Sequence, residues 1–253
     1  MIIVSCCDQE GGIFTIDENT LAVQKVVDTE TRGIDIDKGE LFACNKGGLQ
    51  VYDLDFNLLR STSKPNDWHG LRVIDNAVNA VSATEDTLYI FSKDLTLEGK
   101  ATLREGTGQG RNHINDLFYA NGALYYSMFS DMVKESYKLG PGCIKKTNNG
   151  AGPVITSLQE PHTVYIYESE LYYCNSAKGT FHKGVETIID TDSYTRGIEI
   201  TDSHYWVGCS KDRHNRGNNG PCGVIRCNRK NRLDTVFIPL PAQNVYGLAR
   251  GEQ

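Results

Sequence analysis

Short apolar runs recur along the whole chain. Typical examples are ELFACN at 40–45, TLYIFS at 87–92 and ELYYCN at 170–175. Valine, isoleucine, tyrosine and phenylalanine dominate these runs, and glycine, asparagine or aspartate bounds them. This pattern is typical of short β-strands. Because no helical periodicity of useful length accompanies it, the sequence predicts an all-β protein.

An internal repeat organises the predicted strands. Six segments each open with a polar residue, usually followed by a small residue and then an aliphatic one; they open at Arg32, His69, Asn115, His162, Arg196 and Tyr246. The average spacing, counted around the ring through both termini, is about 42 residues, which is typical of one four-stranded propeller blade. The repeat therefore predicts six blades.

The sixth repeat is divided between the two ends of the chain. VYGLAR at 245–250 supplies one strand, and IIVSCC at 2–7, GIFTID at 12–17 and LAVQKVV at 21–27 supply the other three. A blade built from both ends closes the ring and removes open sheet edges. We therefore predict that residues 1–253 form a single domain, a six-bladed β-propeller whose last blade is closed by N- and C-terminal strands. No linker or second domain is evident.

Polar residues occupy the positions that should line the central channel. The first strand of each blade is expected to line it, and side chains two residues apart share a face of a strand. The positions two residues before the openings are Glu30, Asp67, His113, Glu160, Tyr194 and Asn244. All twelve positions carry polar groups, and three of the six histidines of the chain are among them. We expect the functional site in this channel.

The residue types in the channel suggest two chemistries. His69, His113 and His162 come from consecutive blades and are accompanied by Asp67 and Glu160. Neutral imidazoles with carboxylates can hold a divalent metal or act as acid–base groups. A polar channel that only binds water explains the same residues.

Two arginines form a second feature. Arg32 and Arg196 occur in matching motifs, TRGIDI and TRGIEI, on the blades either side of the split blade. A guanidinium group suits a carboxylate or phosphate, so these arginines are expected to bind the negative group of a small-molecule substrate. The alternative is an internal ion pair with Glu30, Asp35 or Glu199.

Two long loops, 130–141 and 210–221, are expected at the same face as the openings of the first strands. Long loops on a rigid scaffold often carry function. The side chains of Lys134, Tyr137, Arg213 and His214 are candidates to cover the channel mouth. Ordinary surface insertions are the alternative explanation.

Composition narrows the possible partners. The net charge is −6, so no broad affinity for nucleic acid or an anionic membrane is expected. No apolar run approaches the roughly 18 residues of a membrane span, and the N-terminus lacks the basic region of a secretory signal. A cytoplasmic location is the default expectation. The eight cysteines fall mostly within strand patterns and form no CxxC motif, so they are expected to be buried free thiols.

Two segments resemble known propeller families. GRNHINDLFYANGALYYSMFS at 110–130 resembles the segment around the metal-binding asparagine of the gluconolactonase and senescence-marker group of six-bladed propellers. EPHTVYIYESELYYCNSAKGTF at 160–181 resembles repeats of the streptogramin-lyase group, in which a Pro-His pair opens a channel strand. The resemblance implies metal ligation by Asn115 and gives His162 a role in the channel. The whole pattern also resembles uncharacterised bacterial propellers.

The chain departs from the gluconolactonase pattern at two positions. It has His69 and His162 where acidic or amide ligands are expected. Imidazole ligands favour zinc or manganese over calcium. The predicted cofactor is therefore a divalent ion, zinc, manganese or calcium, with His69, Asn115 and His162 as its ligands.

These features together predict a metal-assisted lyase or hydrolase that acts on a small, polar, anionic substrate such as a sugar acid or lactone. The predicted proton-transfer groups are His113, Glu160 and Asp67, and the predicted substrate-binding groups are Arg32, Arg196, Tyr194 and Tyr246. The alternative is a non-catalytic propeller that binds a protein or glycan through the channel face and the long loops. The sequence gives no indication of oligomeric state.

Overall fold

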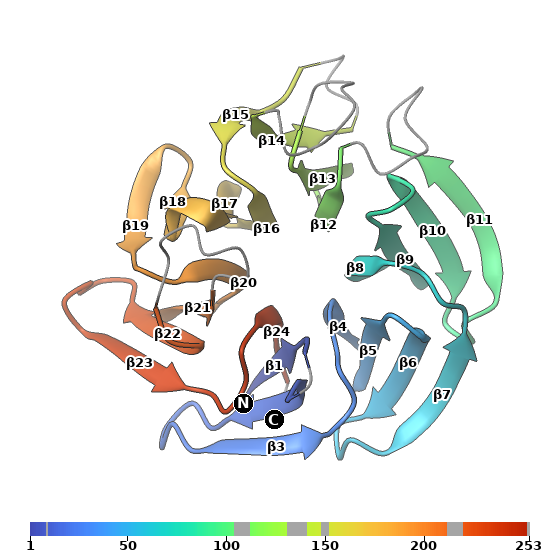
Figure 1. The fold of residues 1–253 in the computed structure, drawn as a ribbon, viewed down its shortest axis with the longest axis horizontal. Coiled ribbons are helices and arrows are strands. Elements are labelled where there is room, and N and C mark those ends of the chain that lie inside the picture. Colours follow the sequence, from blue (N-terminus) through green and yellow to red (C-terminus); the bar gives the residue numbers. More distant parts are fainter. Residues whose placement is uncertain (9, 104–111, 131–140, 148–151, 212–219, 252–253) are drawn as a thin grey trace.

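The computed structural model describes residues 1–8, 10–103, 112–130, 141–147, 152–211 and 220–251. Within these residues the strands form six four-stranded antiparallel sheets, arranged as blades around a central axis (Figure 1). The chain is therefore a six-bladed β-propeller, as the repeat predicted.

The first three blades follow the chain in order. Blade 1 comprises β4 (Ile34–Asp37), β5 (Glu40–Asn45), β6 (Gly48–Asp53) and β7 (Leu58–Ser63). Blade 2 comprises β8 (Trp68–Ile74), β9 (Ala77–Ser82), β10 (Thr87–Ser92) and β11 (Leu97–Thr102). Blade 3 comprises β12 (Ile114–Ala120), β13 (Ala123–Met128), β14 (Gly142–Lys146) and β15 (Ile155–Leu158).

The remaining blades complete the ring. Blade 4 comprises β16 (Pro161–Tyr167), β17 (Glu170–Asn175), β18 (Thr180–Lys183) and β19 (Glu186–Asp190), with a short 3-10 turn at Ser176–Lys178. Blade 5 comprises β20 (Tyr194–Ile200), β21 (His204–Ser210), β22 (Gly223–Asn228) and β23 (Thr235–Pro239). Blade 6 joins β24 (Val245–Arg250) to β1 (Ile2–Cys6), β2 (Gly12–Ile16) and β3 (Val23–Val27).

Blade 6 closes the propeller as predicted. The C-terminal strand β24 is its innermost strand and pairs antiparallel with β1, with Val4 opposite Leu248. Next to this pairing, the Gly251 amide donates to the Met1 carbonyl at 3.1 Å. The two ends of the chain are therefore held together by the backbone of one sheet (Figure 1).

The hydrophobic core lies between neighbouring blades. Trp68, at the start of blade 2, is fully buried in a cluster that also contains Phe42 and Leu49 of blade 1. A similar cluster joins Trp206 of blade 5 to Phe14 of blade 6. All eight cysteines are buried thiols, as the sequence predicted. Packing between blades thus fixes the six inner strands in place.

A β-bulge sits at the start of the inner strands. The pairing register shifts next to Tyr246, His69, Asn115, His162 and Arg196, in blades 6, 2, 3, 4 and 5. A bulge places two residues opposite one and changes which face the following side chains occupy. The residue three positions after the opening lines one pocket in all six blades. In the five blades with a bulge, strict alternation would have turned this residue away from the channel.

The inner strands consequently line the channel in three layers. The upper layer holds the six opening residues, Arg32, His69, Asn115, His162, Arg196 and Tyr246. The middle layer holds the next residue of each blade, Gly33, Gly70, Asp116, Thr163, Gly197 and Gly247. The lower layer holds the residues three positions after the openings, Asp35, Arg72, Phe118, Tyr165, Glu199 and Ala249.

Candidate functional site

The six residues of the upper layer are all buried, with exposed fractions between 1% and 7%. The ring of Tyr246 lies at the centre of several of their contacts. The Arg196 guanidinium carbon lies 3.2 Å from the centroid of the Tyr246 ring, and the His69 ring centroid lies 5.5 Å from it. The Arg32 guanidinium carbon lies 5.9 Å from the same ring. Side chains from blades 1, 2, 5 and 6 thus converge around Tyr246.

Arg32 is held by an internal ion pair. Its Nη1 atom donates to Asp67 Oδ1 at 2.6 Å and to the Trp68 carbonyl at 2.9 Å. Its Nε atom lies 3.6 Å from Glu30 Oε1. The predicted ion pair between Arg32 and Glu30 is therefore present. The closest partner of Arg32, however, is Asp67.

Asp67 also contacts His69. The distance from His69 Nε2 to Asp67 Oδ1 is 3.4 Å. Burial pushes the pKa of Asp67 upwards, but the contacts with His69 and Arg32 outweigh it and hold this pKa well below its usual value. An ionised carboxylate only accepts hydrogen bonds, so His69 carries its proton on Nε2 and presents a lone pair on Nδ1.

The two neighbouring histidines are neutral at pH 7. Burial lowers the pKa of His69 to about 4, and the charges of Arg196 and Arg32 add to this effect against the opposing influence of Asp67. Burial, with His69 and both arginines, also lowers the pKa of His113 well below its usual value. The two rings meet edge to face at 5.0 Å between centroids. Neutral imidazoles can accept a proton or ligate a metal.

His162 belongs to a separate polar group on the other side of Phe129. The Phe129 ring stacks on His113 at 4.6 Å and meets His162 edge to face at 5.0 Å. His162 Nδ1 lies 3.0 Å from the Glu160 carbonyl oxygen, which can only accept, so the ring proton is on Nδ1. The Tyr194 hydroxyl donates to Glu160 Oε2 at 3.0 Å. Glu160, His162 and Tyr194 thus form one hydrogen-bonded group.

Several buried polar atoms of the upper layer lack a hydrogen-bond partner among the described residues. They are His69 Nδ1, Asn115 Oδ1, Arg196 Nη2, Tyr246 OH and Arg32 Nε. Buried polar atoms are normally paired. Arg196 is the most unusual of them, because no carboxylate of the described residues pairs with its charge. Leaving a buried charge unpaired costs several kcal/mol.

The alternative prediction, an internal ion pair for each arginine, is wrong for two of the suggested partners, Asp35 and Glu199. Asp35 pairs with Arg72 at 3.2 Å and accepts a hydrogen bond from the Val73 amide, instead of pairing with Arg32. Glu199 accepts a hydrogen bond from the Tyr165 hydroxyl at 3.2 Å, instead of pairing with Arg196. Both carboxyl groups lie in the lower layer, away from the arginines of the upper layer. In blade 5 the register shift between Thr195 and Ile198 accounts for the position of Glu199.

The donor atoms of the predicted metal site are present, but the described side chains do not gather around one point. Asn115 Nδ2 donates to the carbonyls of His113 and Pro161, at 3.0 Å and 3.4 Å, so its Oδ1 remains an available ligand atom. Within the described residues, no group of three or more His, Cys, Asp and Glu side chains is arranged to hold a metal ion. Phe129 separates His113 from His162. We therefore derive no chemical step through a metal.

Some expectations lie outside the described residues. They concern most of the loops 130–141 and 210–221, including Lys134, Tyr137, Arg213 and His214. In the part of the chain that the structure describes, no helix has the length and apolar character needed to cross a membrane.

The site includes contacts that the sequence did not indicate. Phe129 directly follows β13, the second strand of blade 3, and Ser176 Oγ lies 3.1 Å from His162 Nδ1. Neither belongs to an inner strand, and the repeat gave no signal for them. Asn244, predicted to line the channel, donates a hydrogen bond to Asp8 Oδ2 at 3.1 Å.

The neutral histidines make stability depend on pH. The pKa of His69 is about 4 in the folded protein and about 6.5 in an unfolded chain. The unfolded state therefore binds more protons between these values, and the free energy of unfolding should fall by up to about 3 kcal/mol as pH drops from 6.5 to 4. Urea unfolding at several pH values measures this. The loss should be smaller for His69→Gln; an equal loss would show that other groups cause it.

Comparisons with known proteins support the assignment of the fold. No family model and no curated protein sequence matches the chain. A protein of unknown function from Bacteroides caccae superposes with a TM-score of 0.70 at 9% identity, over 98% of this chain and 97% of that chain. A chain of a nidogen–laminin complex does so with a TM-score of 0.71 at 11% identity, over 98% and 97%. Regucalcin from Agrobacterium tumefaciens, a calcium-binding protein, gives a TM-score of 0.62 at 15% identity, over 87% and 77%.

The chain is thus a six-bladed propeller that shares its fold with the gluconolactonase and senescence-marker group, and with streptogramin B lyase at a TM-score of 0.53. These similarities confirm the predicted structural relationship. Because enzymes and a chain from a protein complex share the fold, the fold leaves open whether this protein is catalytic.

Proposed function

We propose that the protein binds a small organic anion at the upper layer of the channel and acts on it as a lyase or hydrolase by acid–base chemistry. The observation that carries the proposal is Arg196, a buried guanidinium without a carboxylate partner among the described residues. A bound carboxylate or phosphate would supply the missing charge and accept from Nη2. The predicted role of Arg196 in substrate binding is thereby retained.

Arg32 has a different role in this proposal. Its charge is already matched by Asp67 at 2.6 Å, so it positions Asp67 and, through it, His69. Tyr246 stacks on Arg196 and has an unpartnered hydroxyl group. That hydroxyl is a second donor for the same anion. The anion site therefore consists of Arg196 and Tyr246, from blades 5 and 6.

His69 is the proposed base. Asp67 fixes its tautomer, and the unpartnered Nδ1 lone pair lies on a ring that contacts Tyr246. In a lyase this atom would take a proton from a carbon next to the substrate carboxylate; in a hydrolase it would take one from water. The charge of Arg196 lowers the pKa of His69. A bound anion would offset that charge and make His69 a stronger base only when substrate is present.

The proposal is tested with sugar acids, their lactones and inorganic phosphate, using tag-free protein. We expect at least one of the anions to raise the melting temperature relative to equal chloride, and at least one sugar acid or lactone to be turned over. His69→Gln should retain the binding and lower turnover by about 10²- to 10⁴-fold, the usual contribution of a general base. Full turnover in His69→Gln would contradict the role of His69.

Metal assistance is tested in the same preparations. Elemental analysis of the wild type and of His69→Ala/His162→Ala should show a near-stoichiometric zinc, manganese or calcium ion only in the wild type if these residues, with Asn115, form a metal site. Equal metal content in both proteins would contradict that ligand set. Anion binding without turnover of any compound would instead favour the non-catalytic propeller, consistent with a fold found in a protein complex.

A further inference from the structure

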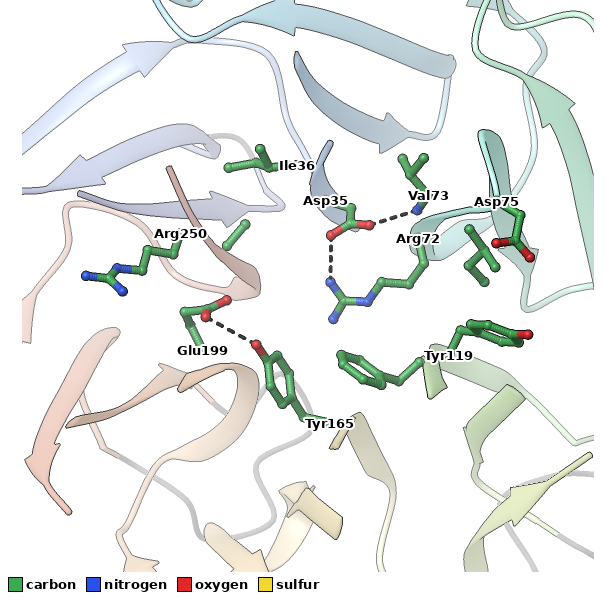
Figure 2. Close-up of a pocket in the computed structure, with 12 residues that line it drawn as sticks. Asp35, Ile36, Arg72, Val73, Asp75, Tyr119, Tyr165, Glu199 and Arg250 are labelled. Carbon is green, nitrogen blue, oxygen red and sulfur yellow. Dashed lines mark hydrogen bonds and ion pairs between the residues drawn. The ribbon is translucent and has the colours of Figure 1, made fainter. Parts of the chain in front are cut away.

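A pocket surrounded by the lower layer lies at the end of the channel opposite the upper layer (Figure 2). It has a volume of about 400 Å³, within the range of small-molecule sites. Five of its lining side chains come from inner strands of different blades: Asp35, Arg72, Phe118, Tyr165 and Glu199. Figure 2 shows Asp35, Arg72, Tyr165 and Glu199 facing a common space. This pocket is not part of the site proposed above.

The middle layer separates the two ends of the channel. It encloses a cavity of only about 10 Å³, lined by Gly33, Gly70, Asp116 and Thr163 among others, which is room for about one water molecule. A Cβ atom on Gly70 would lie 2.6 Å from Asp116 Oδ1, so no larger residue fits there without a shift. A ligand in the lower pocket would therefore make no direct contact with one at the upper layer.

The charges around the lower pocket are unbalanced. Arg72 pairs with Asp35 at 3.2 Å, and its Nε donates to the Leu117 carbonyl at 3.2 Å. The same guanidinium is the main positive charge acting on Asp116 and on Glu199. Arg250, at the rim, pairs with Glu18 at 3.1 Å. Three carboxyl groups thus share one guanidinium, which already has a close partner.

Glu199 is the carboxyl group least well compensated. Its Oε1 atom accepts a hydrogen bond from the neutral Tyr165 hydroxyl at 3.2 Å. Burial raises the pKa of Glu199 to about 7; Asp35 adds to this rise, and Arg72 opposes it. The other charged groups on the neighbouring inner strands are Asp37 from β4, which pairs with Lys93, Asp116 from β12 and Arg250 from β24. Asp75, which follows β8, also lines the pocket. A positive charge placed in the pocket would stabilise the ionised form of Glu199.

The walls beside Glu199 suit an organic cation. The rings of Phe118 and Tyr165 contact each other at 4.6 Å between centroids, and both line the pocket together with the aliphatic side chains of Ile36 and Val73. Aromatic faces attract cations, and aliphatic groups cover a hydrocarbon stem. An inorganic ion would leave these apolar walls unused.

We propose that the lower pocket binds a small organic cation with a primary ammonium or guanidinium group, which pairs with Glu199 while its stem lies against Phe118 and Tyr165. The cation completes the charge balance that Arg72 leaves unsatisfied. The site is separate from the anion site at the upper layer, and each can exist without the other.

The experiment is isothermal titration of the full chain with butylammonium, butylguanidinium and butyrate at pH 6, 7 and 8. Both cations should bind, and their dissociation constants should fall by about tenfold from pH 6 to pH 8, because a carboxyl group with a pKa near 7 ionises over this interval. Binding at pH 7 should release protons, seen as a dependence of the heat on the buffer. Saturating butyrate, a carboxylate of the class proposed for the upper layer, should not displace the cations.

The variant Glu199→Gln should weaken cation binding at least tenfold and remove its pH dependence, because an amide keeps the hydrogen bond with Tyr165 but carries no charge. Glu98→Gln, on the exposed strand β11, is the matched control and should bind as wild type. Cation affinity that is unchanged in Glu199→Gln, or binding without proton release in the wild type, would overturn the proposal. The proton measurement uses unmodified protein and holds even if the variant folds poorly.

Discussion

Replacing Arg196 with methionine should strongly weaken anion binding at the upper layer while leaving the protein as stable as the wild type. Removing a charged donor should weaken a bound carboxylate or phosphate by about 10- to 100-fold. The guanidinium is buried without a carboxylate partner in the described residues, so its removal also relieves a desolvation cost. We expect the free energy of unfolding of Arg196→Met to lie within about 1 kcal/mol of the wild type, or above it.

Arg32→Met is the matched control, because Arg32 has the same residue type, motif and burial. Its charge, however, is paired with Asp67 at 2.6 Å. Breaking this pair leaves Asp67 without its closest cation and should lower the free energy of unfolding by about 2–3 kcal/mol, a value reduced by the partial exposure of Asp67.

Two measurements decide between the roles of these arginines: urea unfolding, and calorimetric titration with the anions that stabilise the wild type. The proposal predicts opposite outcomes, with binding lost in Arg196→Met and stability lost in Arg32→Met. A loss of several kcal/mol in Arg196→Met would mean that Arg196 has a structural partner, and would contradict the anion site.

Ending the chain after Asn244 should abolish the native fold. This truncation removes β24, the innermost strand of blade 6, including the buried side chains of Val245, Leu248 and Ala249. Each buried aliphatic side chain contributes roughly 1–3 kcal/mol, and β1 also loses the hydrogen bonds of one edge. The sum is comparable to the total stability of about 5–15 kcal/mol of a typical domain. Near-ultraviolet circular dichroism and thermal unfolding measure the effect.

Two further chains serve as controls for the truncation. A chain that ends at Gly251 keeps β24 and its hydrogen bond to Met1, and should unfold like the wild type. A circular permutant with joined termini and new ends at the exposed turn around Val185 should also fold, because it preserves every blade. A cooperative native transition in the chain ending at Asn244 would show that blade 6 does not hold the ring closed.

The sequence predicted which residues lie around the channel better than it predicted which side chains they contact. His69, Asn115, His162 and Arg196 are buried around the channel because they open strands at regular intervals. The contact of His69 with Asp67 follows from alternation along one strand. The contact of Arg196 with Tyr246 joins two blades, and no pattern within either blade indicates it. The metal, the substrate and the catalytic roles remain predictions.

The lower pocket shows why a repeat is not sufficient to find a site. Asp35, Arg72, Tyr165 and Glu199 lie at equivalent positions of their blades, and the repeat alignment of the sequence already shows this equivalence. Strict alternation, however, turns a residue three positions after a channel residue away from the channel. In blades 2 to 6 the β-bulges reverse this, and the sequence contains no unambiguous signal for them.

The sequence by itself determined the fold class, the number of blades, the closure through both termini and the polar character of the channel. It could do so because strand periodicity and repeat length are local properties of the chain. The tertiary structure alone decided which charges are paired, which histidines are neutral and which carboxyl groups share Arg72. These outcomes depend on burial and on distances between blades, and electrostatic energies change steeply with both.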